Sequence, residues 1–324
     1  MISTIPMLDF EVFSQQLITG LSNGMIIALI AIGYTMVYGI IELINFAHGD
    51  VFMLGAFLAL TLLGALGMEA WGPSGQVFGV ALMLIGSAVF CGGLNWSLDR
   101  LAYRALRKSS KLSLLVSAIG CSFVCMNLGL FWGGAPMTVF ANGNSAAAPK
   151  NFPAIIPQIN LLGDGFLRIT PADLLVFTVT IPLMVGLTFM VKRTRLGRAM
   201  RAVAQDPTAA SLMGIPVDRV IGATFFIGGA LGGFASVIYS LYNNTIGFQM
   251  GTRAGLDAFT AAVLGGIGSL PGAVLGGLTI GCVRSMSDQY LETRWTNTIV
   301  FCILVLILIF RPNGLLGSTR REKV

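Results

Sequence analysis

Eight apolar segments with short polar connections dominate this sequence and restrict what it can fold into. They lie at about 17–41, 46–66, 77–98, 112–133, 172–191, 220–241, 256–286 and 297–310. Hydrophobic residues make up 55% of the 324 residues and charged residues only 10%, which is outside the range of soluble globular domains. About 20 apolar residues are enough for a helix to cross a bilayer. We therefore expect an all-α, polytopic membrane protein with about eight helical segments, forming a single transmembrane domain over 1–324.

The segment 256–286 is too long to cross a bilayer as one straight helix, and its middle is rich in residues that disfavour helices. At ~1.5 Å per residue it would extend about 46 Å, whereas the hydrocarbon core is roughly 30 Å thick. Glycine lowers helix propensity and proline removes a backbone donor. We expect a broken, re-entrant helix pair with a short first limb at about 256–264. Because irregular backbone in a membrane is buried by protein or lines a wet cavity, this break supplies candidate translocation-pathway residues: Gly265, Gly266, Gly268, Ser269, Pro271 and Gly272.

Basic residues gather in three stretches, at about 100–111, 192–219 and 311–323. Basic connections stay on the cytoplasmic side of a membrane, so topology explains the formal net charge of +6 and no nucleic-acid partner is indicated. The rule places 192–219 in the cytoplasm and makes 134–171 the largest external loop. Counting crossings, the N-terminus is external, and the re-entrant pair begins and ends on the outer side. The external loop either covers the helices or contacts a soluble partner.

The cytoplasmic loop contains a short helix with signals at both ends. Asp206 is a good N-cap, Pro207 suits the first helical position, and Gly214 can adopt the left-handed C-cap conformation. The small and apolar side chains of this helix can fit a groove in another protein. Alternatively, the helix lies on membrane lipid, held by the surrounding arginines. The candidate coupling residues are Asp206, Pro207, Ala209, Ala210, Leu212, Met213 and Gly214.

A polar interruption between the first two apolar segments holds the only histidine. Ionisable residues at membrane depth are functional candidates by default, but Asn45 or His48 could also cap the next helix at a cytoplasmic turn. One histidine without clustered cysteines or carboxylates does not form a metal site. The candidate pathway residues here are Asn45, Phe46, His48, Gly49 and Asp50.

Three charged residues, Asp257, Arg284 and Asp288, fall near the outer ends of the re-entrant limbs. They could meet the carboxylate and ammonium groups of a zwitterionic substrate at an outer mouth. Alternatively, Arg284 and Asp288 neutralise each other, because residues four apart are neighbours on one helix face.

No motif of a catalytic or nucleotide-binding protein is present. The glycines of 265–272 are not part of G-x-x-x-x-G-K-[ST], and neither G-x-S-x-G nor H-E-x-x-H occurs. The five cysteines are scattered and match neither a disulfide framework nor zinc-ligand spacing. We expect a transport subunit rather than an enzyme, with no catalytic residue, metal or cofactor on this chain.

Four blocks of sequence then resemble one known family. They are AIGYTMVYGIIELINFAHGDVFMLGAF, GRAMRAVAQDPTAASLMGI, AFTAAVLGGIGSLPGAVLGGL and RPNGLLG. In this order they resemble the LivH-type permeases of bacterial ABC importers for branched-chain amino acids. The resemblance implies a multi-pass protein of the bacterial cytoplasmic (inner) membrane. It also implies four kinds of contact: a second permease subunit, two ATP-binding subunits that carry ATP and Mg²⁺, a periplasmic substrate-binding protein, and membrane lipid.

By the same analogy, 207–213 is the helix that docks on an ATP-binding subunit, and 45–50 and 265–272 belong to the pathway. Related ABC permeases for urea or amides remain an alternative. An ion-coupled secondary transporter of small polar solutes also uses broken helices. An intramembrane enzyme is a third alternative, for which His48 and Asp50 are the only candidate groups.

Overall fold

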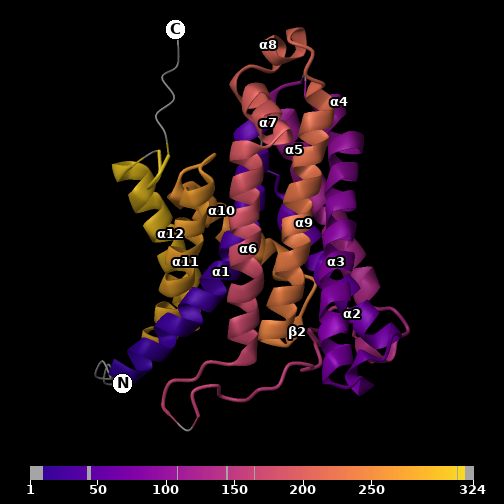
Figure 1. The fold of residues 1–324 in the computed structure, drawn as a ribbon, viewed down its shortest axis with the longest axis vertical. Helices are drawn as coiled ribbons and strands as arrows, with labels where there is room; N and C mark the ends of the chain where they lie inside the picture. Colours follow the sequence, from indigo (N-terminus) through magenta and orange to yellow (C-terminus); the bar gives the residue numbers. More distant parts are fainter. Residues whose placement is uncertain are drawn as a thin grey trace.

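In a computed structural model, the described part of the chain is almost entirely helical. The structure describes residues 10–41, 45–107, 109–143, 145–163, 165–311 and 313–317, so the basic tail beyond 317 lies outside the described residues. Within these ranges, seven helices are long and apolar enough to cross a membrane, which confirms the expected all-α, polytopic fold (Figure 1).

In chain order the elements are α1 (Phe10–Ile41), α2 (Ala47–Ala65), η1 (Met68–Ala70), α3 (Pro73–Leu98), η2 (Asp99–Tyr103), α4 (Arg104–Leu106), α5 (Lys111–Gly133), η3 (Thr138–Gly143), β1 (Lys150–Asn151), α6 (Pro171–Arg193), α7 (Arg195–Gln205), α8 (Pro207–Leu212), α9 (Val217–Asn243), β2 (Thr245–Ile246), α10 (Met250–Gly265), α11 (Leu270–Tyr290) and α12 (Thr293–Phe310).

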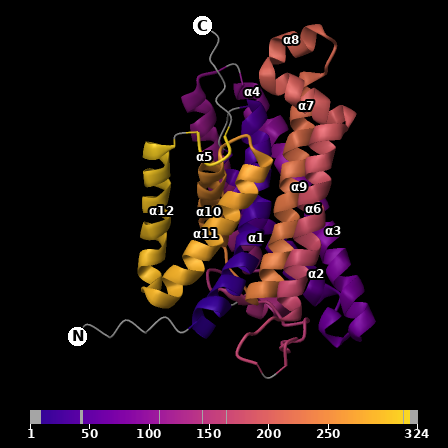
Figure 2. The same cartoon turned by 60° about the vertical axis from the view of Figure 1, so that its left-hand side comes forward.

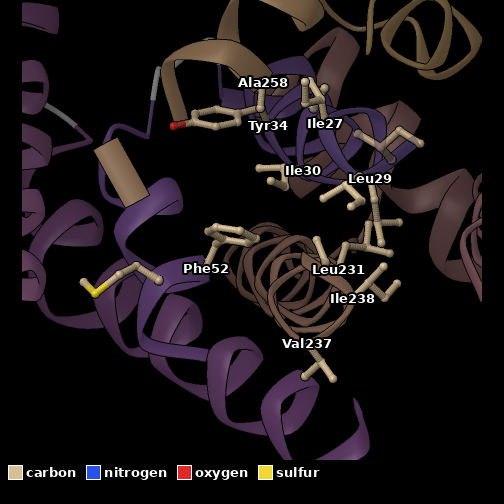
Figure 3. Packing of buried hydrophobic residues seen from close by; sticks show 14 of the residues in the cluster. Ile27, Leu29, Ile30, Tyr34, Phe52, Leu231, Val237, Ile238 and Ala258 are labelled. Carbon is tan, nitrogen blue, oxygen red and sulfur yellow. The ribbon is translucent and has the colours of Figure 1, made fainter. Parts of the chain in front are cut away.

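Helices α1, α2 and α9 form the buried centre, whereas α5, α6 and α12 are mostly exposed. The aliphatic side chains of α1 meet those of α9, and Phe52 of α2 packs beside them (Figure 3). All six helices are comparably apolar, because lipid tails are as apolar as a protein interior. Hydropathy alone therefore does not separate the central helices from the lipid-facing ones.

Small residues let α11 lie directly against α1. A Cβ placed on Gly281 would overlap the backbone of Gly24, and one on Gly277 would overlap the backbone of Ala28. Such stripes of small residues allow helix backbones to approach closely in membranes, where packing rather than water exclusion drives association.

We expect Gly281→Val to reduce the yield of folded protein severely, because the new side chain would have to push α1 and α11 apart. Overpacking of this kind costs about 3 kcal/mol. The measurement is the monodisperse peak of the tagged protein in size-exclusion chromatography. Gly186→Val on α6 is the matched control, since a Cβ there meets nothing within 4 Å. Equal yields of the two variants would contradict the close approach.

The break within 256–286 is confirmed, but the first limb is longer than expected. Helix α10 has 16 residues and begins at Met250, rather than at about 256. The connection uses positive φ angles of 103° at Gly266 and 88° at Gly268, which glycine adopts at little cost. Ser269 then caps α11 by accepting a hydrogen bond from Gly272 N–H at 3.2 Å.

The tip of this hairpin lies against the residues that follow α12 (Figure 2). The backbone N–H groups of Leu315 and Leu316 donate to the carbonyl oxygens of Leu264 and Gly265, both at 2.9 Å. These bonds satisfy carbonyls that a helix C-terminus leaves free. Leu315 and Leu316 therefore close the glycine turn between α10 and α11.

The two ends of the bundle differ in what they carry. Helices α7 and α8 lie at one end, and the long loop before α6 lies at the other (Figure 1). Strand β1 of this loop pairs antiparallel with β2, matching Lys150 with Ile246. Phe140 and Phe152 of the loop are fully buried. The described part of the loop is thus anchored to the bundle.

Candidate functional site

A cavity of about 770 Å³ opens on the side of the bundle that carries the long loop. Its walls come from α1, the end of α9, the first half of α10 with the segment leading into it, and the C-terminal part of α11, with Ala147 and Pro149 of the loop at its rim. The three charged residues singled out by sequence, Asp257, Arg284 and Asp288, all line this cavity. The structure therefore brings that group together.

Arg284 makes its ion pair across the hairpin, not along its own helix. Its Nη1 donates to Asp257 Oδ1 at 2.5 Å, and its Nη2 donates to Asn297 Oδ1 at 3.2 Å. Asp288 accepts a hydrogen bond from the Thr296 hydroxyl at 2.5 Å. Since α10 and α11 pack together, Asp257 reaches Arg284 although 27 positions separate them. The alternative pairing of Arg284 with Asp288 does not form.

Arg253 is a cavity residue that the sequence analysis did not single out. It lies one helical turn before Asp257, it is exposed, and it lines the cavity. Among the described residues it has no carboxylate partner within salt-bridge distance. The signal in the sequence that could have identified Arg253 was its position as a lone basic residue just before the broken segment 256–286. The cavity thus contains a free cation, together with Asp288, whose partner is neutral.

The inner wall of the cavity is aliphatic. Ile26, Ile27 and Ile30 of α1 and Met250 of α10 line it. The neighbouring hydroxyl of Ser285 donates to the backbone oxygen of Gln16 at 2.8 Å. An apolar wall with a few polar groups at one end is the usual form of a small-molecule site.

The stretch from Asn45 to Asp50 forms a separate, buried cluster. The side-chain amide of Asn45 donates to Asn95 Oδ1 at 3.0 Å, and the Tyr103 hydroxyl donates to Asn45 Oδ1 at 2.8 Å. Asn95 in turn donates to the carbonyl oxygen of Phe225 at 2.7 Å. These bonds fix the start of α2 to α3, η2 and α9. Phe46 contacts Phe259 of α10, with ring centroids 6.4 Å apart.

His48 and Asp50 lie deeper in the same cluster and are almost fully buried. The His48 ring meets Tyr34 edge-on at a centroid distance of 4.8 Å, and neither ring nitrogen has a partner with hydrogen-bond geometry among the described residues. Asp50 accepts a hydrogen bond from Ser122 of α5. Neither side chain lines the outer cavity.

Helix α10 connects the three groups that the structure keeps apart. In its first half, a Cβ on Gly255 would come within 3.3 Å of Gly49 Cα. The same half supplies Arg253 and Asp257 to the cavity. Its end is the glycine turn at Gly265, where Gly266 is buried and Gly268 is exposed. A displacement of α10 would therefore be transmitted to the buried cluster, the cavity and the turn.

Helix α8 has the capped form expected from sequence. Asp206 Oδ1 accepts hydrogen bonds from the N–H groups of Thr208 and Ala209, at 2.8 Å and 3.0 Å. Pro207 is the first helical residue, and Gly214 has a φ of 80°. Ala210 is buried, whereas Leu212 is 84% and Met213 83% exposed. Two large apolar residues are thus exposed at the end of α8, and α8 lies at the end of the bundle opposite the long loop (Figure 1).

Clusters of three or more potential metal ligands do not occur within the described ranges. The five cysteines are all free thiols, and they lie on different helices or on different turns of α5.

Comparison with known proteins gives a consistent result over nearly the whole chain. The family described as branched-chain amino acid transport system, permease component, matches residues 16–309. The high-affinity branched-chain amino acid permease LivH of Salmonella typhimurium is 40% identical over 320 residues, covering 98% of this chain and 99% of the relative. The corresponding protein BraD of Pseudomonas aeruginosa is 39% identical, covering 96% and 98%. No solved structure matches.

Proposed function

Because this chain belongs to the permease family of branched-chain amino acid ABC transporters, we propose that its outer cavity receives a branched-chain amino acid during import. The chain is a multi-pass membrane subunit and not an enzyme. Membership of this family also decides against the ion-coupled transporter and the intramembrane enzyme that the sequence left open.

The observation that carries this proposal is the distribution of polarity in the cavity. The free guanidinium of Arg253 suits an amino-acid carboxylate, and Asp288 suits the ammonium group. The aliphatic wall formed by Ile26, Ile27 and Ile30 suits a branched apolar side chain. Urea and simple amides have no apolar part that would fill this wall, so the cavity favours the amino acid.

Transport is proposed to follow alternating access. Two ATP-binding subunits drive it, a second permease subunit completes the pathway, and a periplasmic binding protein delivers substrate to the outer face. A partner can shift a conformational equilibrium only through unequal contacts with the two states. The exposed apolar tip of α8 supplies such a contact with an ATP-binding subunit. Because α10 contacts α1, α2 and α11, its movement would open or close the outer cavity.

The test is uptake of labelled leucine, urea and acetamide by cells that lack their own importers and express this chain with its partner subunits. We expect leucine uptake that is lost on ATP depletion and survives a protonophore at constant ATP. Uptake of urea or acetamide without leucine would overturn the substrate assignment. Leucine uptake abolished by the protonophore alone would overturn the proposed drive.

We expect Arg253→Gln to lower leucine uptake about tenfold at limiting substrate, with unchanged amounts of protein in the membrane. A hydrogen bond to a charged group contributes about 1.5–3 kcal/mol, and each 1.4 kcal/mol is a factor of ten. The matched control is Arg294→Gln, an exposed arginine that does not line the cavity. Equal uptake by wild type and Arg253→Gln would remove Arg253 from the site.

A further inference from the structure

A second cavity, of about 580 Å³, lies at the end of the bundle that carries α8. Its walls come from the end of α3, from η2 and α4, and from the connection between α8 and α9. Three arginines, Arg100, Arg104 and Arg219, line it. None of these residues belongs to the outer cavity or to the exposed tip of α8.

Two of these arginines have no carboxylate partner. Arg104 donates to Asp218 at 2.5 Å, and Arg107 bridges Asp218 and Asp99. This network neutralises both acidic residues of the cavity. Arg100 and Arg219 are exposed and pair with no carboxylate in the part of the chain that the structure describes. The cavity therefore presents two free positive charges.

One of these charges stands at the end of a lipid-facing stripe. The exposed apolar residues Phe78, Ile85, Val89 and Trp96 of α3 are spaced by seven, four and seven positions, so they share one helix face. Arg100 follows four positions after Trp96 on that face. From Phe78 to Trp96 the helix rises ~27 Å, close to the roughly 30 Å of a hydrocarbon core. Arg100 thus lies where the hydrocarbon ends.

The residue type of Trp96 fits this boundary. The residue is 41% exposed, and tryptophan is enriched at membrane interfaces. The Arg100 guanidinium lies over the Trp96 ring, 5.4 Å from its centroid, which holds the charge at the mouth of the cavity. An acyl chain lying along the α3 stripe would place its phosphate beside Arg100.

We propose that this cavity binds the headgroup of an anionic phospholipid of the cytoplasmic leaflet, with Arg100 and Arg219 holding the phosphate. Basic pockets between transmembrane helices on the cytoplasmic side have this chemistry. A free phosphate would use the arginines but leave the apolar stripe without a role. Arg219 lies in the first turn of α9 and Ser211 belongs to α8, so the bound lipid would link the lipid-facing helix α3 to the connection that carries α8.

The test uses the full-length protein, purified in mild detergent with its partner subunits and titrated with lipids in native mass spectrometry. Dioleoyl phosphatidylglycerol is compared with dioleoyl phosphatidylcholine, which has the same acyl chains. We expect the wild type to retain phosphatidylglycerol in preference to phosphatidylcholine. The double variant Arg100→Gln with Arg219→Gln should bind phosphatidylglycerol roughly 25-fold more weakly than the wild type. That figure follows from about 1 kcal/mol per basic residue near a lipid surface and 1.4 kcal/mol per factor of ten.

The matched control is Arg195→Gln with Arg198→Gln, which removes the same charge from exposed positions of α7 that do not line the cavity. Unchanged phosphatidylglycerol binding by the Arg100 and Arg219 variant would overturn the proposal. If the control variant loses the same amount of phosphatidylglycerol affinity, the lipid is held by the general positive charge of the surface and not by this cavity. Full competition by soluble glycerophosphoglycerol would show a phosphate-ester site rather than a lipid site. If the Arg100 and Arg219 variant loses the ATP-binding subunits but still prefers phosphatidylglycerol, the two arginines contact a protein partner and not a lipid.

Discussion

Replacing Leu212 and Met213 together by aspartate is expected to abolish leucine uptake while the permease stays folded. Both side chains are more than four-fifths exposed, so the isolated chain loses no internal packing. In the assembled transporter they would enter an apolar groove of an ATP-binding subunit. Burying an unpaired charge there costs several kcal/mol, and each 1.4 kcal/mol is a factor of ten in binding.

The measurement is co-purification of the ATP-binding subunits with the tagged permease, together with uptake in the same cells. The matched control is Leu162→Asp with Phe166→Asp, which adds the same charge to exposed apolar residues of the opposite end. We expect the control to keep its ATP-binding subunits. If the α8 variant retains them as well, the alternative in which α8 rests on lipid headgroups gains support.

The second large effect is expected at the ion pair between α10 and α11. Asp257→Asn should lower the free energy of unfolding by about 2 kcal/mol, because it leaves Arg284 without its carboxylate in a largely apolar surrounding. This value is below the cost of breaking a fully buried ion pair, because the Arg284 side chain is 25% exposed and the Asp257 side chain 16% exposed. Arg284→Gln should behave similarly. Substituting both residues together should cost less than either single change, because no unpaired charge is left.

Unfolding in increasing concentrations of denaturing detergent measures this effect, and the double-mutant cycle isolates the pair from the two single substitutions. Asp288→Asn is the matched control, because Asp288 has a hydroxyl partner rather than an ionic one. Purely additive effects of Asp257→Asn and Arg284→Gln would show that the pair does not hold the hairpin. The same variants report on the cavity, since both side chains line it.

Local features of this protein were predictable because their causes are local. The capped helix α8 depends on Asp206, Pro207 and Gly214, which act on neighbouring backbone groups. The break between α10 and α11 depends on Gly266 and Gly268, whose positive φ angles suit glycine at little cost. The length of the first limb was wrong because α10 continues toward its N-terminus through Gly251 and Gly255, residues of low helix propensity. Packing of these two glycines on the start of α2 outweighs that propensity.

The candidate site was only partly predictable from sequence. Asp257, Arg284 and Asp288 were expected near one another and do line one cavity, but the ionic partner of Arg284 was not predictable. The aliphatic wall of α1 carried no signal that separates it from other apolar segments, and the only signal for Arg253 was its position as a lone basic residue beside the broken segment. The pathway roles of 45–50 and of 265–272 stay predictions, as does the coupling role of α8.

The sequence by itself determined that the described chain is helical and apolar enough to cross a membrane several times, and where the capped helix α8 and the glycine break before α11 lie. Tertiary structure alone decided which apolar helices are central, which charges meet across the hairpin, and where the two cavities lie. The reason is that hydrocarbon and protein interior are equally apolar, so hydropathy specifies insertion but not neighbours. Neighbours are set by close backbone approach at glycines and by a few buried polar groups, whose partners lie far away along the chain.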